Sequence, residues 1–515
     1  IVKVLSFFLS KDKNSIFLMF KKLRWQMLVV LITLILVGVL LLSQQPTIQT
    51  VLTQPTSGGV YTEALIGSMS RLNPLADRNN PVDRDVNRLL FSGLIRFDSQ
   101  GLPQPDLAEA WGTSQDGTIY NFSIRPNAIW HDGQPVTTDD VIFTVELIKS
   151  NSSFYTQDIK ALWEEVEIRR MDEKTMQFRL PEPFVPFLDY LTFGVLPKHI
   201  LENVPADQLL SADFNLNPVG SGPYEFDHLL VDEGQITGVV LQSFPNYYGE
   251  EPYIPQVVFR YYPSPQAALE AYQQGEVLGI SQITEVILDD ALLEENLSLY
   301  TSRRPEISMI LFNLQNNEKG FFQEYPVREA LLTGLNRQRM INNFLRGQAI
   351  LADGPILPST WAYYDGLERV DYSTDKAIRI LKGEGYVIPA EGGDVRAKDG
   401  VFLTFTLLHP DDALHTSLAE SIQSDWARLG VRVDLEPVPY EQLIHSRLAE
   451  RSYEAALIDL NLSYTPDPDP YPFWHQSEIT GGQNYSQWDN RAASEYLERA
   501  RVTADINERA RLYRN

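Results

Sequence analysis

The chain has 515 residues, of which 43% are hydrophobic and 22% are charged, a composition typical of a globular protein with a large core. Its formal net charge of −25 would repel phosphates, so we expect no nucleic-acid partner. The lack of cysteine excludes disulfides, thiolate metal sites, a catalytic thiol and a cysteine-linked lipid anchor.

The amino-terminal region contains one long apolar segment. Residues 27–42 are almost all apolar and follow a basic flank. Because no small-x-small cleavage site follows them, they are more typical of a retained membrane anchor than of a cleaved signal peptide. We therefore expect residues 19–42 to be an anchor or a signal that leaves the rest of the chain outside the membrane. The composition of residues 43–59 predicts a flexible linker. We expect residues 1–18 to be an untranslated or disordered lead.

In the first third of the chain, alternating and helical patterns predict several short elements. Residues 120–125 alternate apolar and polar side chains, the pattern of a half-buried strand, and a turn at Gly133 follows. Thr137 and Asp140 form a capping box before an apolar run, so a helix should begin there. Similar patterns predict strands over 61–66, 94–97 and 176–180, an amphipathic helix over 81–91, and a short helix after 184–187.

The rest of the chain continues with strands and helices. Strands are predicted over 222–226, 238–242, 256–260, 307–314, 402–408, 431–435 and 453–458, and helices over 267–274, 327–345, 374–382, 416–429 and from 492 onward. The mostly apolar strand 307–314 should pass from one sheet into the next. Residues 402–435 read as a βαβ unit whose helix ends at Gly430.

Five groups of motifs follow one another along the chain. They are Asn73-Pro-Leu75 with Leu90-Phe-Ser-Gly-Leu94; Leu107-Ala-Glu-Ala-Trp111 with Trp130-His-Asp-Gly133; Gly220-Ser-Gly-Pro-Tyr224; Val327-Arg-Glu-Ala330 with Leu335-Asn-Arg337; and Asp467-Pro-Asp-Pro-Tyr471 with Phe473-Trp474. In this order they resemble family 5 of the bacterial extracellular solute-binding proteins, the dipeptide- and oligopeptide-binding components of ABC importers. The resemblance extends from Val60 to Asn515.

The resemblance implies an α/β fold of the type II periplasmic-binding-protein class, with two lobes, an extra domain on the first lobe, and crossover strands as hinges. The first lobe would comprise residues 60–97 and 206–305, the extra domain residues 98–205, and the second lobe residues 306–515. Family members return to the first lobe at their carboxyl end. Since no such return follows the last helical pattern, we expect the sequence to be truncated after Asn515.

The resemblance also implies a receptor and not an enzyme. Such a receptor captures dipeptides or oligopeptides in the periplasm or at the cell surface and delivers them to an ABC permease, as a monomer without a cofactor. An oligosaccharide, a nickel chelate or haem is the alternative ligand on the same scaffold, and a surface hydrolase or adhesin is a more remote alternative. The seven histidines form no paired ligand motif, which argues against a metal-dependent enzyme.

Ligand contacts are expected in the loop after strand 453–458. In peptide-binding relatives, a carboxylate three residues before the Asp-Pro-Asp motif pairs with the peptide's amino group; here that position is Tyr464, which carries no charge. Asp467 or Asp469 is the substitute, unless both only shape the turn beside their prolines. Other predicted contacts, each also explicable by capping or packing, are Asn79, Asn80, Asn313, Asn461, Asn484 and Tyr485.

Overall fold

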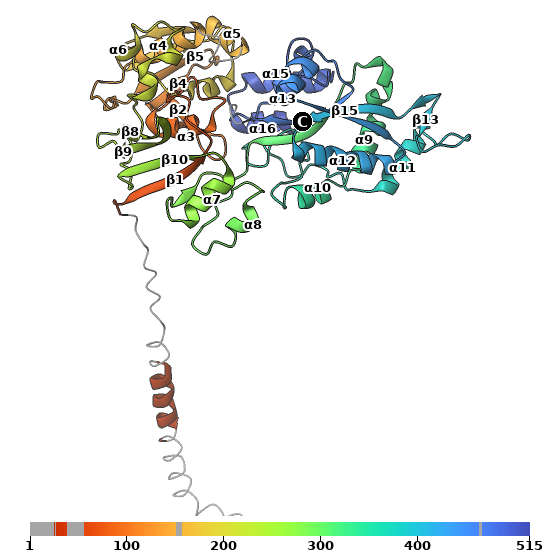
Figure 1. Cartoon of the computed structure of the whole chain (residues 1–515), viewed down its shortest axis with the longest axis horizontal. Coiled ribbons are helices and arrows are strands. Elements are labelled where there is room, and N and C mark those ends of the chain that lie inside the picture. Colours follow the sequence, from red (N-terminus) through yellow and green to blue (C-terminus); the bar gives the residue numbers. More distant parts are fainter. Residues whose placement is uncertain (1–24, 26, 39–55, 151–156, 463–465) are drawn as a thin grey trace, which may run out of the picture. The chain divides into compact units, whose positions relative to one another are not determined.

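The computed structural model describes residues 25, 27–38, 56–150, 157–462 and 466–515. The chain divides into two compact units, residues 1–56 and residues 57–515. In the first unit, residues 27–38 form a helix (Figure 1). Most of its side chains are exposed. Among the described residues, no helix combines the length and apolar character that crossing a membrane requires. The predicted lead 1–18, most of the linker 43–59 and both ends of the segment 19–42 lie outside the described residues.

The second unit begins with a five-stranded sheet in the order β11-β1-β10-β9-β8. Its strands are β1 (Val60–Ile66), β8 (Tyr224–Asp232), β9 (Gln235–Ser243), β10 (Gln256–Tyr262) and β11 (Gly279–Ile280). Strand β1 is parallel to β10 and β11, whereas β8, β9 and β10 form an antiparallel meander. Helix α7 (Pro265–Gln273) connects β10 to β11, and its Ala268 packs with Ala64 of β1. The strands predicted from alternation in this part are confirmed.

A second sheet, in the order β4-β5-β7-β6, is antiparallel throughout. It contains β4 (Ala108–Thr113), β5 (Ile119–Ile124), β6 (Glu167–Arg170) and β7 (Thr175–Arg179), with α4 (Thr138–Ser150) and α5 (Gln157–Glu165) between β5 and β6. As predicted, β5 buries Tyr120, Phe122 and Ile124. The predicted helix start is confirmed too, because the carboxylate of Asp140 accepts the backbone N–H of Thr137 at 2.7 Å. One continuous apolar core packs this sheet and the first one together.

Shorter elements complete this part of the chain. They are α3 (Pro81–Leu90), β2 (Ile95–Phe97), β3 (Pro103–Pro105), η1 (Val185–Leu191), α6 (Lys198–Leu201), η2 (Leu209–Ser211), η3 (Asp213–Leu216) and α8 (Leu288–Ala291). Helix α3 buries Val82 and Leu90, as its amphipathic pattern predicts. At its carboxyl end, the carbonyl oxygen of Leu90 accepts the N–H of Gly222 at 2.8 Å. A Cβ on Gly220 would lie 2.7 Å from the carbonyl carbon of Leu90, so this motif needs glycine to pass the helix.

A third sheet has the order β12-β17-β15-β16. Its strands are β12 (Glu306–Phe312), β15 (Thr404–Pro410), β16 (Arg432–Val438) and β17 (Ala455–Asn461). Strand β15, helix α12 (Ala413–Arg428) and β16 form the predicted parallel βαβ unit, and Gly430 follows α12 at φ +81°. Strand β12 is the edge strand and pairs antiparallel with β17. The prediction that this strand continues into another sheet is wrong, because among the described strands β12 pairs only with β17 and belongs to the third sheet alone.

The remaining helices and hairpins surround the third sheet. They are η4 (Asn317–Gln323), α9 (Tyr325–Thr333), α10 (Arg337–Phe344), α11 (Thr374–Gly383), β13 (Ala397–Lys398), β14 (Val401–Phe402), α13 (Tyr440–Gln442), η5 (Leu443–Leu448), α14 (Tyr471–Trp474), η6 (Gln476–Ile479), α15 (Arg491–Val502) and α16 (Ile506–Arg514). The single helix predicted over 327–345 is wrong. Helix α9 ends at Thr333, with Gly334 as its carboxyl-terminal cap, and Asn336 starts α10 by capping its first turn. The helical pattern from 492 is likewise divided, because Asp505 caps a new helix, α16.

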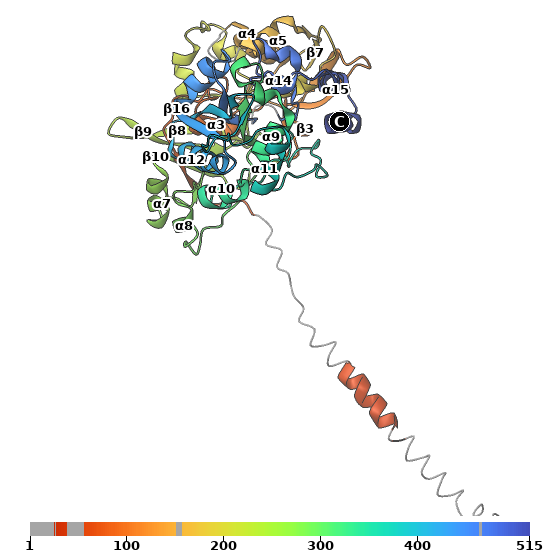
Figure 2. The ribbon, with the colours of Figure 1, turned by 90° about the vertical axis from the view of Figure 1, so that its right-hand side faces the viewer.

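We call residues 57–305, which contain all the sheets before β12, the first lobe, and residues 306–515, from β12 onward, the second lobe. Figure 1 shows the first lobe in red to green and the second lobe in green to blue. A separate apolar core around Phe322, Phe405 and Trp426 fills the second lobe. Figure 2 turns this lobe toward the viewer, with α9, α10, α11 and α12 grouped on it. Helix α15 of the second lobe lies against η1 of the first.

Candidate functional site

A cavity of about 280 Å³ lies where the two lobes meet. It is lined by the loop 97–101, by Arg303, Pro305, Ile307 and Met309, by Pro355, Leu357, Ser359 and Thr360, by Leu460 and Leu462, and by Pro466–Pro470, Phe473 and Trp474. Ile307 and Met309, two positions apart on β12, both line it, as the pleat of a strand allows, and β17 contributes Leu460. Proline, aliphatic and aromatic side chains make up most of the wall, which therefore suits apolar groups.

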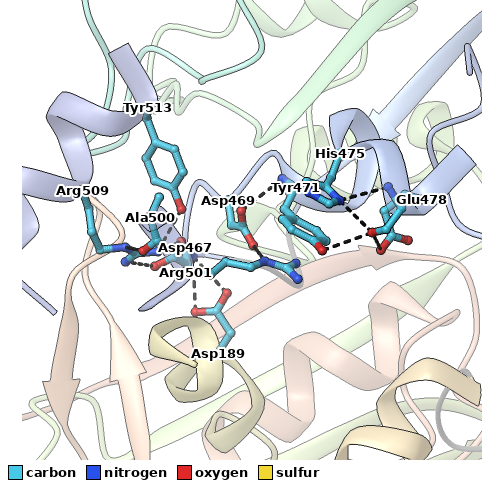
Figure 3. Close-up of polar contacts among 11 residues, drawn as sticks. Asp189, Asp467, Asp469, Tyr471, His475, Glu478, Ala500, Arg501, Arg509 and Tyr513 are labelled. Carbon is cyan, nitrogen blue, oxygen red and sulfur yellow. Dashed lines mark hydrogen bonds and ion pairs between the residues drawn. The ribbon is translucent and has the colours of Figure 1, made fainter. Parts of the chain in front are cut away.

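The loop that follows β17 is fixed to helix α16 by a buried ion pair (Figure 3). Arg509 donates to both carboxylate oxygens of Asp467, at 2.6 and 2.9 Å. Both residues are buried, with 4% of Arg509 and 8% of Asp467 exposed. A bidentate guanidinium–carboxylate pair is the geometry that best offsets the cost of removing two charges from water. The negative charge of Asp467 is thereby neutralised inside the protein.

A second arginine, from α15, neutralises the neighbouring carboxylate. Arg501 donates through Nε to Asp469 at 2.7 Å, and Asp469 also accepts the backbone N–H of Tyr471 at 3.1 Å. The guanidinium of Arg501 lies 3.5 Å from the ring centroid of Tyr471 and 5.4 Å from that of Phe184, a first-lobe residue. On its other face, Tyr471 stacks on His475 with the ring planes 7° apart. These contacts fix the start of α14, which carries Phe473 and Trp474 into the cavity wall.

A carboxylate of the first lobe reaches the same loop. Asp189, in η1, accepts the backbone N–H of Asp467 with both oxygens, at 3.1 and 3.3 Å. Only 6% of Asp189 is exposed. Burial raises the pKa of Asp189 well above its usual range, and the nearby charge of Asp467 adds to this shift. Burial also raises the pKa of Asp467, while Arg509 opposes the shift. The ionised forms of the two carboxyl groups are therefore stabilised by this arginine and by backbone N–H groups.

Of the nine predicted ligand contacts, Asp467 and Asp469 line the cavity. Asn461 is the last residue of β17, directly before the lining residue Leu462, and Tyr464 lies outside the described residues. Asn80 caps α3 by accepting the N–H of Val82 at 3.0 Å, and its exposed neighbour Asn79 precedes the same helix.

The other three predicted contacts, Asn313, Asn484 and Tyr485, bond to loops of the second lobe. Asn313 donates to the carbonyl oxygens of Arg451 and Tyr453 and accepts from Gln487. Asn484 is fully buried and donates to the backbone of His475 and Trp488. The carbonyl oxygen of Tyr485 accepts the hydroxyl of Tyr453 at 2.7 Å. These interactions tie loops of the second lobe to one another, and a ligand role for the three residues stays a prediction.

Three charged residues of the site, Asp189, Arg501 and Arg509, are not among those the sequence predicts. Asp189 lies 278 residues from its hydrogen-bond partner Asp467 and belongs to no motif. A usable signal exists for the arginines, since two aspartates in a proline-rich, apolar loop need cationic partners when buried. The helical pattern after residue 490 supplies such cations, with Arg501 in the last turn of α15 and Arg509 on the buried face of α16.

The site has the chemistry of reversible binding. It offers apolar walls and neutralised carboxylates. Within residues 56–150, 157–462 and 466–515, no three His, Asp or Glu side chains gather as ligands for a metal ion. A ligand in this cavity would contact both lobes, so its binding free energy would favour the arrangement in which the lobes are together.

The sequence of residues 103–482 matches the family model "Bacterial extracellular solute-binding proteins, family 5 Middle". This match covers most of the chain. The protein therefore belongs to family 5 of the bacterial extracellular solute-binding proteins. It has the mixed α/β fold of the type II periplasmic-binding-protein class, with two lobes, as predicted.

Individual relatives agree with this assignment. The oligopeptide-binding protein AppA of Bacillus subtilis is 25% identical over 467 residues, which cover 89% of this chain and 84% of AppA. Its solved structure, in complex with a nonapeptide, has a TM-score of 0.66 and covers 89% of this chain and 90% of that chain. The dipeptide-binding protein of Escherichia coli is 25% identical over 434 residues, covering 80% of this chain and 77% of the relative.

Proposed function

We propose that this protein is the substrate-binding receptor of an ABC importer, which captures dipeptides or oligopeptides outside the membrane and delivers them to a permease. The observation that carries the proposal is the apolar cavity between the lobes, walled by the loop after β17. The names of the oligopeptide- and dipeptide-binding relatives support a peptide as ligand. The receptor would act as a monomer, without a cofactor and without covalent chemistry.

The cavity suits a peptide with apolar side chains. Its aliphatic and aromatic walls would bury such side chains, and burial contributes about 25 cal/mol per Å² of apolar surface removed from water. Asp467 and Asp469 would act by shaping the loop, since each is already paired with an arginine. We propose Asn461 and Tyr464, at the other end of this loop, as direct ligand contacts.

The localisation follows the same reasoning. Family membership indicates a protein that works outside the cytoplasm. We propose that the apolar segment 27–42, with its basic flank, is the export signal or the anchor, as its sequence predicts. Separating membrane and soluble fractions of cells that express the full chain and a chain without residues 19–42 checks this proposal. A full chain found only in the soluble fraction would contradict an anchor.

Isothermal titration calorimetry of the full chain against dipeptides, tripeptides and pentapeptides tests the proposed ligand. We expect saturable binding of one peptide per chain. Replacing Trp474 by alanine should weaken binding about 30-fold, because truncating an aromatic anchor at a binding site costs about 2 kcal/mol. The matched control is Tyr300→Ala, which removes a 91% exposed aromatic ring outside the cavity wall and should leave affinity unchanged.

The same titration separates the alternative ligands. The nickel-binding periplasmic protein of Escherichia coli is also 25% identical to this chain, over 437 residues. Nickel–histidine, maltotriose and haem should therefore be titrated beside the peptides. Saturable binding of one of these, with no heat from any peptide, would contradict the proposed peptide receptor and favour a non-peptide solute.

A further inference from the structure

Several contacts join the two lobes around the cavity. The carbonyl oxygen of Gln100 accepts the backbone N–H of Trp361 at 3.1 Å. Next to it, Gly101 passes so close to Pro466 that an added Cβ would lie 2.7 Å from the carbonyl oxygen of Pro466. Gln100 and Gly101 belong to the first lobe, and their partners to the second. The lobes are therefore in direct backbone contact at the rim of the cavity.

Asp189 differs from these contacts because it places a buried carboxyl group in the interface. Its carboxylate lies in the first lobe and is buried, yet the hydrogen bonds it accepts come from the backbone N–H of Asp467 in the second lobe (Figure 3). A buried carboxylate is stabilised only when donors replace the water it has lost. For Asp189, that donor is present only while the two lobes are together.

The loop that Asp189 contacts is the one that walls the cavity. Asp467 lies between Pro466 and Pro468, and all three line the cavity. On the opposite side, the carboxylate of Asp467 is fixed by Arg509, whose guanidinium lies 5.1 Å from the ring centroid of Trp361. The loop is thus bound to its own lobe through the side chain of Asp467 and to the other lobe through its backbone.

We infer that Asp189 is a positioning residue that latches the first lobe onto the ligand loop of the second, so that closing the lobes and fixing the cavity wall are a single event. Both oxygens of Asp189 accept the same backbone N–H, and leaving a buried polar group without its partner costs free energy, which makes this contact an effective latch. The use of this latch in ligand capture rests on the proposed function. The latch itself can be tested without any ligand.

The chain has no cysteine, so two engineered cysteines will carry spin labels without competition. Glu182→Cys in the first lobe and Glu420→Cys in the second place the labels at exposed positions that take no part in the contacts among Asp189, Asp467 and Arg509. Distances between the labels, measured by pulsed electron–electron double resonance on the full chain, report the separation of the lobes. We expect Asp189→Ala to shift the distribution to longer distances, and Asp189→Asn to restore the original one, because the asparagine oxygen also accepts an N–H.

Hydrogen exchange gives a second readout of the same contact. The backbone N–H of Asp467 should exchange about tenfold faster in Asp189→Ala than in the parent chain and return to its original rate in Asp189→Asn. The control is Asp172→Ala, which removes a carboxylate that accepts backbone N–H bonds within the first lobe, from Lys174 and Thr175. This control should change neither the distances nor the exchange of Asp467.

Two outcomes would overturn the latch. One is an unchanged distance distribution in Asp189→Ala with its thermal unfolding still cooperative. The other is a shift that Asp189→Asn fails to reverse, which would show that the hydrogen bond is not what holds the lobes together. A chain that shows the expected shift but binds no peptide would support the latch while contradicting the proposed function, so the two failures are distinguishable.

Discussion

Replacing Arg509 by methionine lowers the free energy of unfolding by about 3–5 kcal/mol, since breaking a buried ion pair leaves the remaining charge without compensation. The carboxylate of Asp467 would lose both guanidinium bonds while staying 8% exposed beside the buried Asp189. Methionine keeps much of the volume of arginine, so the effect reports charge more than packing. Urea unfolding of the full chain, followed by circular dichroism, measures the change.

Two further variants serve as a control and as a test of the cause of this loss. Arg491→Met, also on a helix of the second lobe, removes an arginine that is 86% exposed and paired with Glu495, and should change stability little. The double variant Arg509→Met with Asp467→Leu should regain part of the lost stability, because it removes the carboxylate left unpaired. A loss smaller than about 1 kcal/mol in Arg509→Met would mean that Asp467 finds another partner or water.

Gly220→Ala should be as damaging, for a steric reason. The new Cβ would meet the carbonyl oxygen of Leu90 and lie 2.7 Å from its carbonyl carbon, at the end of α3. Backbone atoms cannot yield as the end of a side chain can, so we expect a loss of about 3 kcal/mol, at the upper end of the range for overpacking. Differential scanning calorimetry measures it as a lower melting temperature.

The control is Gly320→Ala, on η4 of the second lobe. No atom lies within 4 Å of a Cβ built there, and its φ is not in the left-handed region, so alanine should be tolerated. If Gly220→Ala melts at the same temperature as Gly320→Ala, α3 must be able to move away from the Gly220–Tyr224 segment. The motif would then have a role other than close packing.

Local patterns predict most of the elements because their cause is local. The alternation in β5 and the cap at Asp140 depend on neighbours within a few residues, and both are found where the sequence places them. The break between α9 and α10 is missed although Gly334 and the cap at Asn336 are local signals for it. The contact that holds this break, from the N–H of Asn336 to Asp425, is distant in the chain. Side-chain periodicity and local caps can be predicted from neighbouring residues, whereas the contact with Asp425 depends on the tertiary structure.

The site is predicted less completely for the same reason. Asp467 and Asp469 come from a motif and do line the cavity. The partners that decide their charge come from α15 and α16, and the one that reaches across the lobes comes from η1. Nothing in the sequence near the motif specifies which arginine pairs with which aspartate. Such pairings depend on the packing of elements distant in the chain.

The wall of the cavity and its support are built from different residues. Arg501 and Arg509 form ion pairs with the aspartates of the loop. The residues Ile307, Met309 and Leu460 line the cavity. Exchanging these lining residues leaves the ion pairs intact. Ligand selectivity can therefore change during evolution, or be redesigned in the laboratory, without loss of the ion pairs that fix the loop.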